Sequence, residues 1–215
     1  MSMKRRFGAA GVVLVLALAL SVAAPLGSRA ATPSCGVGCY SLYSQDYGTG
    51  YIPAVKNGTA STGEAIDLAA SSDSNSAEDW YPDEIATVAA LEAAGLVSSG
   101  LDQNYGNDMA YEFDYAPQGA ESGLCMGVAS TAADNTAVTL QPCGVSGDTL
   151  WIVDSADVSG GYLPLINGSD TNFSTPYVLK AGSSATSALT TYTLQVTNST
   201  VATSQMWNAE LGELP

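Results

Sequence analysis

The sequence predicts an all-β fold of three unequal repeats, and two patterns carry that prediction. Short runs alternate apolar and polar residues and are rich in β-branched and aromatic side chains, as half-buried strands are. Each of the three tryptophans then follows such a run at a similar distance. The clearest runs are Ile66-Asp67-Leu68, Tyr111-Glu112-Phe113-Asp114-Tyr115, Val138-Thr139-Leu140 and Tyr192-Thr193-Leu194-Gln195-Val196.

The tryptophan spacing defines the repeats. Counted from the leucine of the corresponding run, the three tryptophans follow after twelve, eleven and thirteen residues; they are Trp80 after Leu68, Trp151 after Leu140 and Trp207 after Leu194. A single hairpin cannot bury its own apolar face, whereas three such units together close a barrel and remove the exposed strand edges. We therefore expect a threefold closed β structure in which the tryptophans fill a shared core.

One stretch departs from the strand pattern. Pro82-Asp83-Glu84 has the residue types of a helix start, apolar residues recur at a spacing of three from Ile85 to Leu91, and Gly95 is a typical helix stop. The sequence therefore predicts one short helical insertion near residues 83–94.

The first thirty residues have the three-part pattern of a secretory signal peptide. A basic start, Met1–Arg6, precedes an unbroken run of small and aliphatic residues, and Ser28-Arg29-Ala30 places small residues at positions −3 and −1 of a cleavage point. The alternative is an uncleaved membrane anchor, since the apolar run is almost long enough to span a bilayer. We expect residues 1–30 to be removed, which leaves residues 31–215 as one secreted, extracellular domain.

The charge balance of residues 31–215 excludes several functions. This part holds all 21 acidic residues against two lysines, Lys56 and Lys180, a net charge of −19, and it has no histidine or arginine. Ser-His-Asp and Cys-His catalysis, histidine-ligated metals and arginine clamps on phosphate are therefore excluded. Nucleic-acid binding needs cations for the phosphates and is not expected. We also expect no membrane contact after signal cleavage.

The cysteines agree with an exported protein. An even number in a secreted chain favours disulfides, and the four allow three pairings. Proximity favours Cys35 with Cys39 and Cys125 with Cys143. A zinc site is the alternative, but the spacing provides no second Cys-x-x-Cys half.

The central stretch combines Leu124-Cys125-Met126-Gly127-Val128, a Val-x-Leu strand ending near Cys143, and Leu150-Trp151. This combination resembles one repeat of the ricin B-chain-like β-trefoil lectins. Gln205-Met206-Trp207 matches the Gln-x-Trp signature of that family as written, whereas Glu78-Asp79-Trp80 and Thr149-Leu150-Trp151 are degenerate versions. The resemblance covers about residues 51–210 and implies a β-trefoil with a lectin-like function.

The resemblance does not extend to an intact sugar site. In that family, a binding repeat carries an Asp soon after its first apolar position, and neither Pro53-Ala54 nor Met126-Gly127 offers a carboxylate there. The third repeat does contain polar residues near the corresponding place. We therefore predict that the ligand-binding residues are Asn167, Asp170, Asn172 and Gln205.

Other side chains suggest alternative sites. Four tyrosines crowd residues 40–51 and could form a stacking platform for sugar rings, although ordinary strand and loop positions are the simpler interpretation. Glu112 and Asp114 lie on one face of a predicted strand, as a pair of catalytic carboxylates could, but a polar outer face explains them equally well. The acidic stretches 73–79 and 102–108 resemble calcium loops without completing the pattern, so no metal or other cofactor is predicted.

The sequence therefore predicts a secreted, non-catalytic module that binds carbohydrate and is not an enzyme. The alternative is a protein-interaction or structural trefoil that has lost sugar binding, which the missing Asp in two repeats favours.

Overall fold

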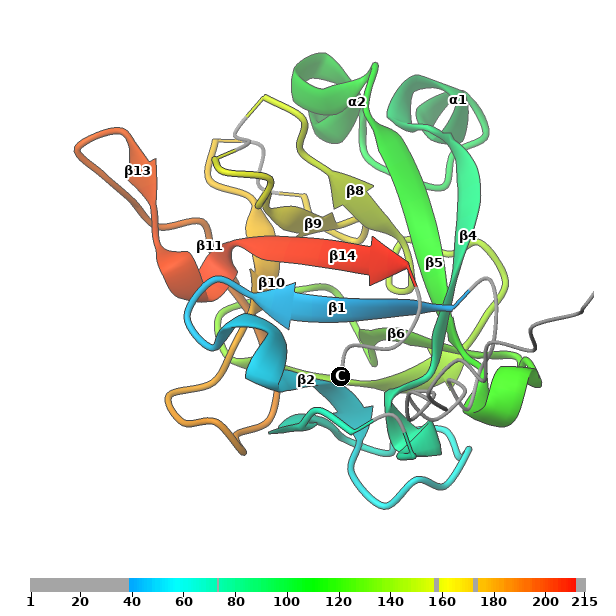
Figure 1. Cartoon of the computed structure of the whole chain (residues 1–215). Coiled ribbons are helices and arrows are strands. Elements are labelled where there is room, and N and C mark those ends of the chain that lie inside the picture. The colour runs from blue at the N-terminus through cyan, green and yellow to red at the C-terminus, as the bar shows by residue number, and fades with distance from the viewer. Residues whose placement is uncertain (1–38, 73, 157–158, 172–173, 212–215) are drawn as a thin grey trace, which may run out of the picture.

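Six strands pair into a closed barrel in the computed structural model, which describes residues 39–72, 74–156, 159–171 and 174–211 (Figure 1). The barrel strands are β1 (Tyr40–Ser44), β4 (Trp80–Thr87), β5 (Met109–Tyr115), β8 (Trp151–Val153), β9 (Leu165–Asn167) and β14 (Trp207–Leu211). They pair antiparallel in the order β14–β1–β4–β5–β8–β9. Leu163 and Trp207 then exchange backbone hydrogen bonds of 2.9 and 2.8 Å, which close the ring between β9 and β14.

Three hairpins cover one end of this barrel. They are β2 (Tyr51–Val55) with β3 (Ile66–Ala70), β6 (Leu124–Val128) with β7 (Thr136–Pro142), and β10 (Tyr177–Lys180) with β11 (Thr190–Thr193). Backbone hydrogen bonds join the hairpins to one another: Leu189 N donates to Ile66 O and Val138 N donates to Leu189 O. These three side chains are fully buried. Each repeat thus contributes two barrel strands and one hairpin, and the fold is the predicted β-trefoil of unequal repeats.

The three tryptophans occupy equivalent places in the repeats. All are at most 1% exposed, and each indole Nε1 donates a 2.9 Å hydrogen bond to a backbone carbonyl in the first strand of its own hairpin. The acceptors are Pro53 for Trp80, Met126 for Trp151 and Leu179 for Trp207. A buried indole N–H needs such a partner, and here the partner ties a barrel strand to the cap above it.

The third repeat differs from its predicted alignment. The carbonyl acceptors Pro53 and Met126 lie opposite Leu68 and Leu140, but Leu179 lies opposite Thr191 and not Leu194. The spacing misled because a small extra hairpin, β12 (Val196–Thr197) and β13 (Thr200–Val201), lengthens the segment before Trp207. Thr191 is accommodated in the interior because its hydroxyl donates to Ala133 O at 2.8 Å.

The helical insertion begins later than predicted and contains two helices. Residues 80–87 form strand β4, which pairs with β5 along its length, so Pro82-Asp83-Glu84 is not a helix start. Helix α1 (Val88–Ala93) begins where the Thr87 side chain accepts from Ala90 N, and Ser98 caps α2 (Ser99–Tyr105) in the same way. Val88, Leu91 and other apolar residues of this insertion form a second core cluster with Ala110 of β5, Ile152 of β8 and Ile166 of β9. Figure 1 shows α1 and α2 side by side next to the upper ends of β4 and β5.

The predicted Cys125–Cys143 disulfide is present and joins the start of β6 to the end of β7. Cys39 is also disulfide-bonded. Its predicted partner Cys35, and the predicted signal peptide at residues 1–30, lie outside the described residues. Within the described part of the chain, no helix is long and apolar enough to cross a membrane. Four 3₁₀ turns complete the fold: η1 (Gly48–Gly50), η2 (Ser76–Glu78), η3 (Pro117–Gly119) and η4 (Thr203–Gln205).

Candidate functional site

A cavity of about 560 Å³ lies within the barrel at the end away from the hairpins, and we call it the barrel-mouth cavity. All six barrel strands or their flanking residues line it: Tyr40, Leu42, Tyr81, Pro82, Glu84, Tyr111, Phe113, Val153, Leu163, Leu165, Trp207, Asn208 and Ala209. The chain path explains its position. Hairpins connect to the ends of β1, β5 and β9, so the starts of these strands point to the open end. Its volume is that of an ordinary small-ligand pocket.

The cavity has an apolar floor and an aromatic rim. Leu42, Phe113, Leu165 and Trp207 are buried, because alternate residues of a barrel strand point inward. Tyr40 and Tyr111 lie nearer the opening and are half-buried, while Tyr81 is 37% exposed. The exposed part of the cavity therefore presents aromatic surface to solvent, above an apolar floor.

Two polar side chains stand among these aromatic rings. The Tyr111 hydroxyl donates to Glu84 Oε2 at 3.2 Å. Burial raises the pKa of Tyr111, and the neighbouring Glu84 carboxylate raises it further, so the phenol keeps its proton and remains a donor. Asn208 adds an amide, whose Oδ1 accepts from Ala209 N at 2.8 Å. Glu84 is the single charged residue among those that line the cavity.

The described residues of the predicted ligand site lie elsewhere and are buried. Asn167 donates to Asp148 O at 3.2 Å and accepts from Ser169, while Asp170 Oδ2 accepts from Tyr177 N at 2.8 Å. Gln205 accepts from Gln195 N and donates to Thr193 O, which fixes the loop before Trp207. Their exposed fractions are 0%, 1% and 0%. Asn172 lies outside the described residues.

None of the three described residues lines the barrel-mouth cavity. In this conformation they support the backbone, and their ligand-binding role stays a prediction.

Superposing the repeats by their tryptophan contacts locates the position where the lectin resemblance places a sugar-binding Asp. The residues that directly follow the three carbonyl acceptors are Ala54, Gly127 and Lys180. A Cβ at Gly127 would lie 2.7 Å from Asp148 O, so no side chain fits there. Lys180 places its ammonium 3.9 Å from the centre of the Tyr192 ring. All three repeats therefore lack the carboxylate, including the third.

The two acids on β5 are buried supports for loops. Glu112 accepts from Val145 N at 3.0 Å and from the Thr149 hydroxyl at 2.5 Å. Val145 has a φ of 55°, which is strained for a β-branched residue, and this hydrogen bond helps to hold it. Asp114 accepts from the backbone of the loop that precedes β6. Their buried hydrogen bonds account for both side chains, and neither lines a cavity described above.

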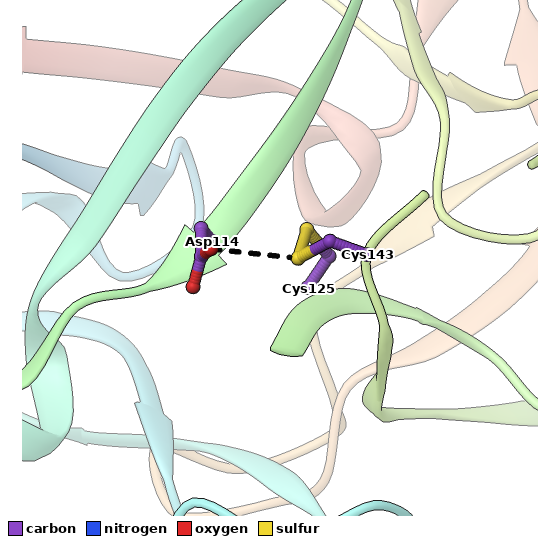
Figure 2. Close-up of side chains that lie close together, drawn as sticks. All are labelled: Asp114, Cys125 and Cys143. Atoms are coloured by element: carbon purple, nitrogen blue, oxygen red, sulfur yellow. Dashed lines mark hydrogen bonds between the residues drawn. A yellow bond between two sulfur atoms is a disulfide. The ribbon is translucent and has the colours of Figure 1, made fainter. Parts of the chain in front are cut away.

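Asp114 also lies beside the disulfide, as Figure 2 shows, with Oδ2 3.5 Å from Cys143 Sγ. Asp114, Cys125 and Cys143 have the spacing of a metal cluster. However, both sulfurs are committed to the disulfide and cannot act as thiolate ligands. Burial raises the pKa of Asp114, and hydrogen bonds from Ser122 and Gly123 partly oppose that shift.

The crowded tyrosines of residues 40–51 are divided between separate places. Tyr40 lines the barrel-mouth cavity, Tyr43 packs edge-on against Tyr162, and Tyr47 contacts Tyr51. They do not form one stacking platform.

Tyr81, Glu84 and Asn208 line the cavity but were not predicted as site residues from the sequence. Glu84 was hidden because residues 82–84 were assigned to a helix start. Its signal lay in the strand alternation that continues beyond Trp80, since Pro82 and Glu84 fall on the same period as the tryptophan. Tyr81 falls on the opposite period, so the alternation carries no signal for it.

Comparison with known proteins supports the fold. No protein-family model matches the sequence, and no curated protein matches it. Among solved structures, a designed threefold symmetric protein, ThreeFoil, is similar with a TM-score of 0.55 and 18% identity, covering 82% of this chain and 99% of that one. The Rhizoctonia solani agglutinin is similar with a TM-score of 0.51 and 15% identity, and the match covers 82% of this chain and 96% of the agglutinin.

A mosquitocidal holotoxin is also similar, with a TM-score of 0.54 and 13% identity. The match covers 82% of this chain but 17% of the toxin. At these identities the likenesses show the fold alone, a β-trefoil shared with an agglutinin and with part of a toxin.

Proposed function

We propose that this chain is an exported, non-catalytic β-trefoil that binds carbohydrate in the barrel-mouth cavity. One observation carries the proposal: three tyrosines, Tyr40, Tyr81 and Tyr111, line a cavity that is also lined by a carboxylate, Glu84, and an amide, Asn208. Aromatic faces pack against the apolar side of a sugar ring, while carboxylates, amides and phenols bind its hydroxyls. The likeness of fold to an agglutinin agrees with this class of function.

The proposal that the protein is not a glycoside hydrolase rests on the positions of its carboxylate side chains. A glycoside hydrolase needs two carboxyl groups that face the same bond. The barrel-mouth cavity is lined by the Glu84 carboxylate alone, and Glu112 and Asp114 are engaged in holding loops. Export is supported by the signal-like residues 1–30 and by the oxidised Cys125–Cys143 pair. Sequencing the secreted protein should give an N-terminus at Ala31.

The binding proposal is tested with a panel of soluble glycans and insoluble polysaccharides, using the purified, oxidised protein and two variants. Tyr81→Ala removes an exposed aromatic face from the rim and should weaken binding about fivefold to tenfold, from the ~1 kcal/mol that such a contact contributes. Tyr177→Ala is the control, because Tyr177 is half-buried but does not line the cavity. Equal affinity of the Tyr81 variant and wild type would move the site away from the barrel mouth.

A protein-interaction trefoil is the second candidate. It is favoured by Ala54, Gly127 and Lys180, which stand in all three repeats where the resembling lectins carry their sugar-binding Asp. If a folded protein bound no member of the glycan panel, this second function would replace the first.

A further inference from the structure

The barrel-mouth cavity has electrostatic surroundings that favour a positively charged ligand group. Its one charged lining residue is Glu84, and the two lysines of residues 31–215 are engaged elsewhere. Lys56 Nζ lies 3.5 Å from Asp67 Oδ2, and Lys180 lies over the Tyr192 ring. With a net charge of −19 on residues 31–215, the surrounding potential also attracts cations. A cationic group that enters the cavity therefore meets a carboxylate and no lysine.

The aromatic rim reinforces this preference. The face of a tyrosine ring attracts a cation placed within about 6 Å of its centre, and Tyr40, Tyr81 and Tyr111 all line this cavity together with Glu84. The Tyr111 hydroxyl fixes Glu84 through Oε2. Oε1, the second oxygen of that carboxylate, makes no hydrogen bond with any described residue. Glu84 is exposed, so its second carboxylate oxygen remains available beside Tyr111. A carboxylate next to an aromatic ring is an arrangement that can bind a substituted ammonium ion.

The position of Glu84 decides where a sugar bound in this cavity would place a positively charged substituent. The apolar floor of Leu42, Phe113, Leu165 and Trp207 accepts no charge, so the cationic group must stay at the rim, beside Glu84. An acidic sugar would bring its carboxylate against Glu84 with no compensating cation, which costs binding energy.

We propose that the barrel-mouth cavity selects amino sugars, with the protonated amine beside Glu84 and the sugar ring against the rim tyrosines. This inference rests on the proposed function, since it names the class of carbohydrate that the same site takes. It extends that function from carbohydrate in general to glucosamine-type residues with a free amine.

The test compares two oligosaccharide series of equal length by calorimetry at slightly acidic pH: glucosamine oligomers, whose amines are protonated, and N-acetylglucosamine oligomers, whose amines are blocked. Wild type should bind the glucosamine series about tenfold more tightly, the combined effect of one exposed ion pair and the cation–π contacts. Glu84→Gln should abolish this difference while it still binds the N-acetylated series.

Asp83→Asn is the matched control for charge. It removes the same negative charge from the same strand, but Asp83 alternates with Glu84 and does not line the cavity. This variant should keep the preference for the free amine. Loss of the preference in both variants would mean that overall charge, and not Glu84, attracts the amino sugar, and would overturn the inference.

The remaining outcomes separate the inference from the proposed function. Equal wild-type affinity for both series, or a preference that survives Glu84→Gln, overturns the amino-sugar assignment but leaves carbohydrate binding in place. Absence of binding to both series and to the wider glycan panel, from protein with a folded circular dichroism spectrum, overturns both.

Discussion

Replacing a repeat tryptophan should cost much of the stability of the fold, and Trp151 gives the cleanest case because it does not line the barrel-mouth cavity. Its side chain is fully buried and donates to Met126 O at 2.9 Å. Burying about 200 Å² of aromatic surface at about 25 cal/mol per Å² corresponds to ~5 kcal/mol. This figure agrees with the 3–5 kcal/mol that tryptophan truncations typically cost.

Two substitutions separate packing from the hydrogen bond. Trp151→Ala loses both and should destabilise the protein by about 5 kcal/mol. Trp151→Phe keeps most of the packing but deprives the buried Met126 carbonyl of its indole donor, and should cost about 2 kcal/mol. Trp80→Phe should cost about the same, because its indole makes the equivalent bond to Pro53.

The free energy of unfolding is measured by urea denaturation followed by far-ultraviolet circular dichroism, a signal that does not depend on the removed fluorophore. Val196→Ala serves as the control, since Val196 is 55% exposed, and should change stability by less than about 0.5 kcal/mol. A loss below about 1 kcal/mol for both Trp151 variants would refute the reasoning that the tryptophans hold the cap to the barrel.

Two further predictions concern covalent and electrostatic stabilisation. Replacing Cys125 and Cys143 together by Ser should reduce the free energy of unfolding by about 3 kcal/mol, from the entropy of a loop with a sequence separation of 18; an unchanged urea midpoint under oxidising conditions would contradict this. Hydrogen bonds from Thr193 lower the pKa of Asp134 from its ordinary value of 3.8. The resulting stabilisation is present above pH 3.8 and is lost as the pH falls through the lowered pKa. Asp134→Ala should therefore be less stable than wild type at neutral pH, and the difference in urea midpoint should shrink in acid; a difference that stays constant or grows in acid would refute the assignment.

The sequence predicted the fold well because its signals report burial. Trp80, Trp151 and Trp207 occupy the same place in each repeat. Because each must fill the shared core, their distances from the preceding strands in the sequence are similar. The alignment by tryptophan spacing was wrong in the third repeat, where the β12–β13 hairpin lengthens the chain and Thr191 takes the place predicted for Leu194. A buried threonine with a local carbonyl acceptor gives no apolar signal.

The candidate site was harder to predict because it has no sequence motif. Tyr40, Tyr81, Glu84 and Asn208 lie on β1, β4 and β14, neighbouring strands that are far apart in the sequence and are brought together only by the pairing of β1 with β14 and with β4. Polar residues that attract notice in a sequence, such as Asp170, proved to be buried and bonded to backbone groups. A buried polar side chain needs hydrogen-bond partners within the protein. The sequence does not distinguish a side chain with this structural role from one that binds a ligand.

We propose that carbohydrate binds in the barrel-mouth cavity and not at the hairpin positions Ala54, Gly127 and Lys180. Nuclear magnetic resonance on the isotope-labelled protein, titrated with an oligosaccharide that binds, tests it most directly. We expect the largest, saturable changes in chemical shift at Tyr40, Tyr81 and Tyr111. Changes centred instead on Ala54 and Lys180 would contradict it, because they would place the sugar in the hairpin positions that lack a carboxylate.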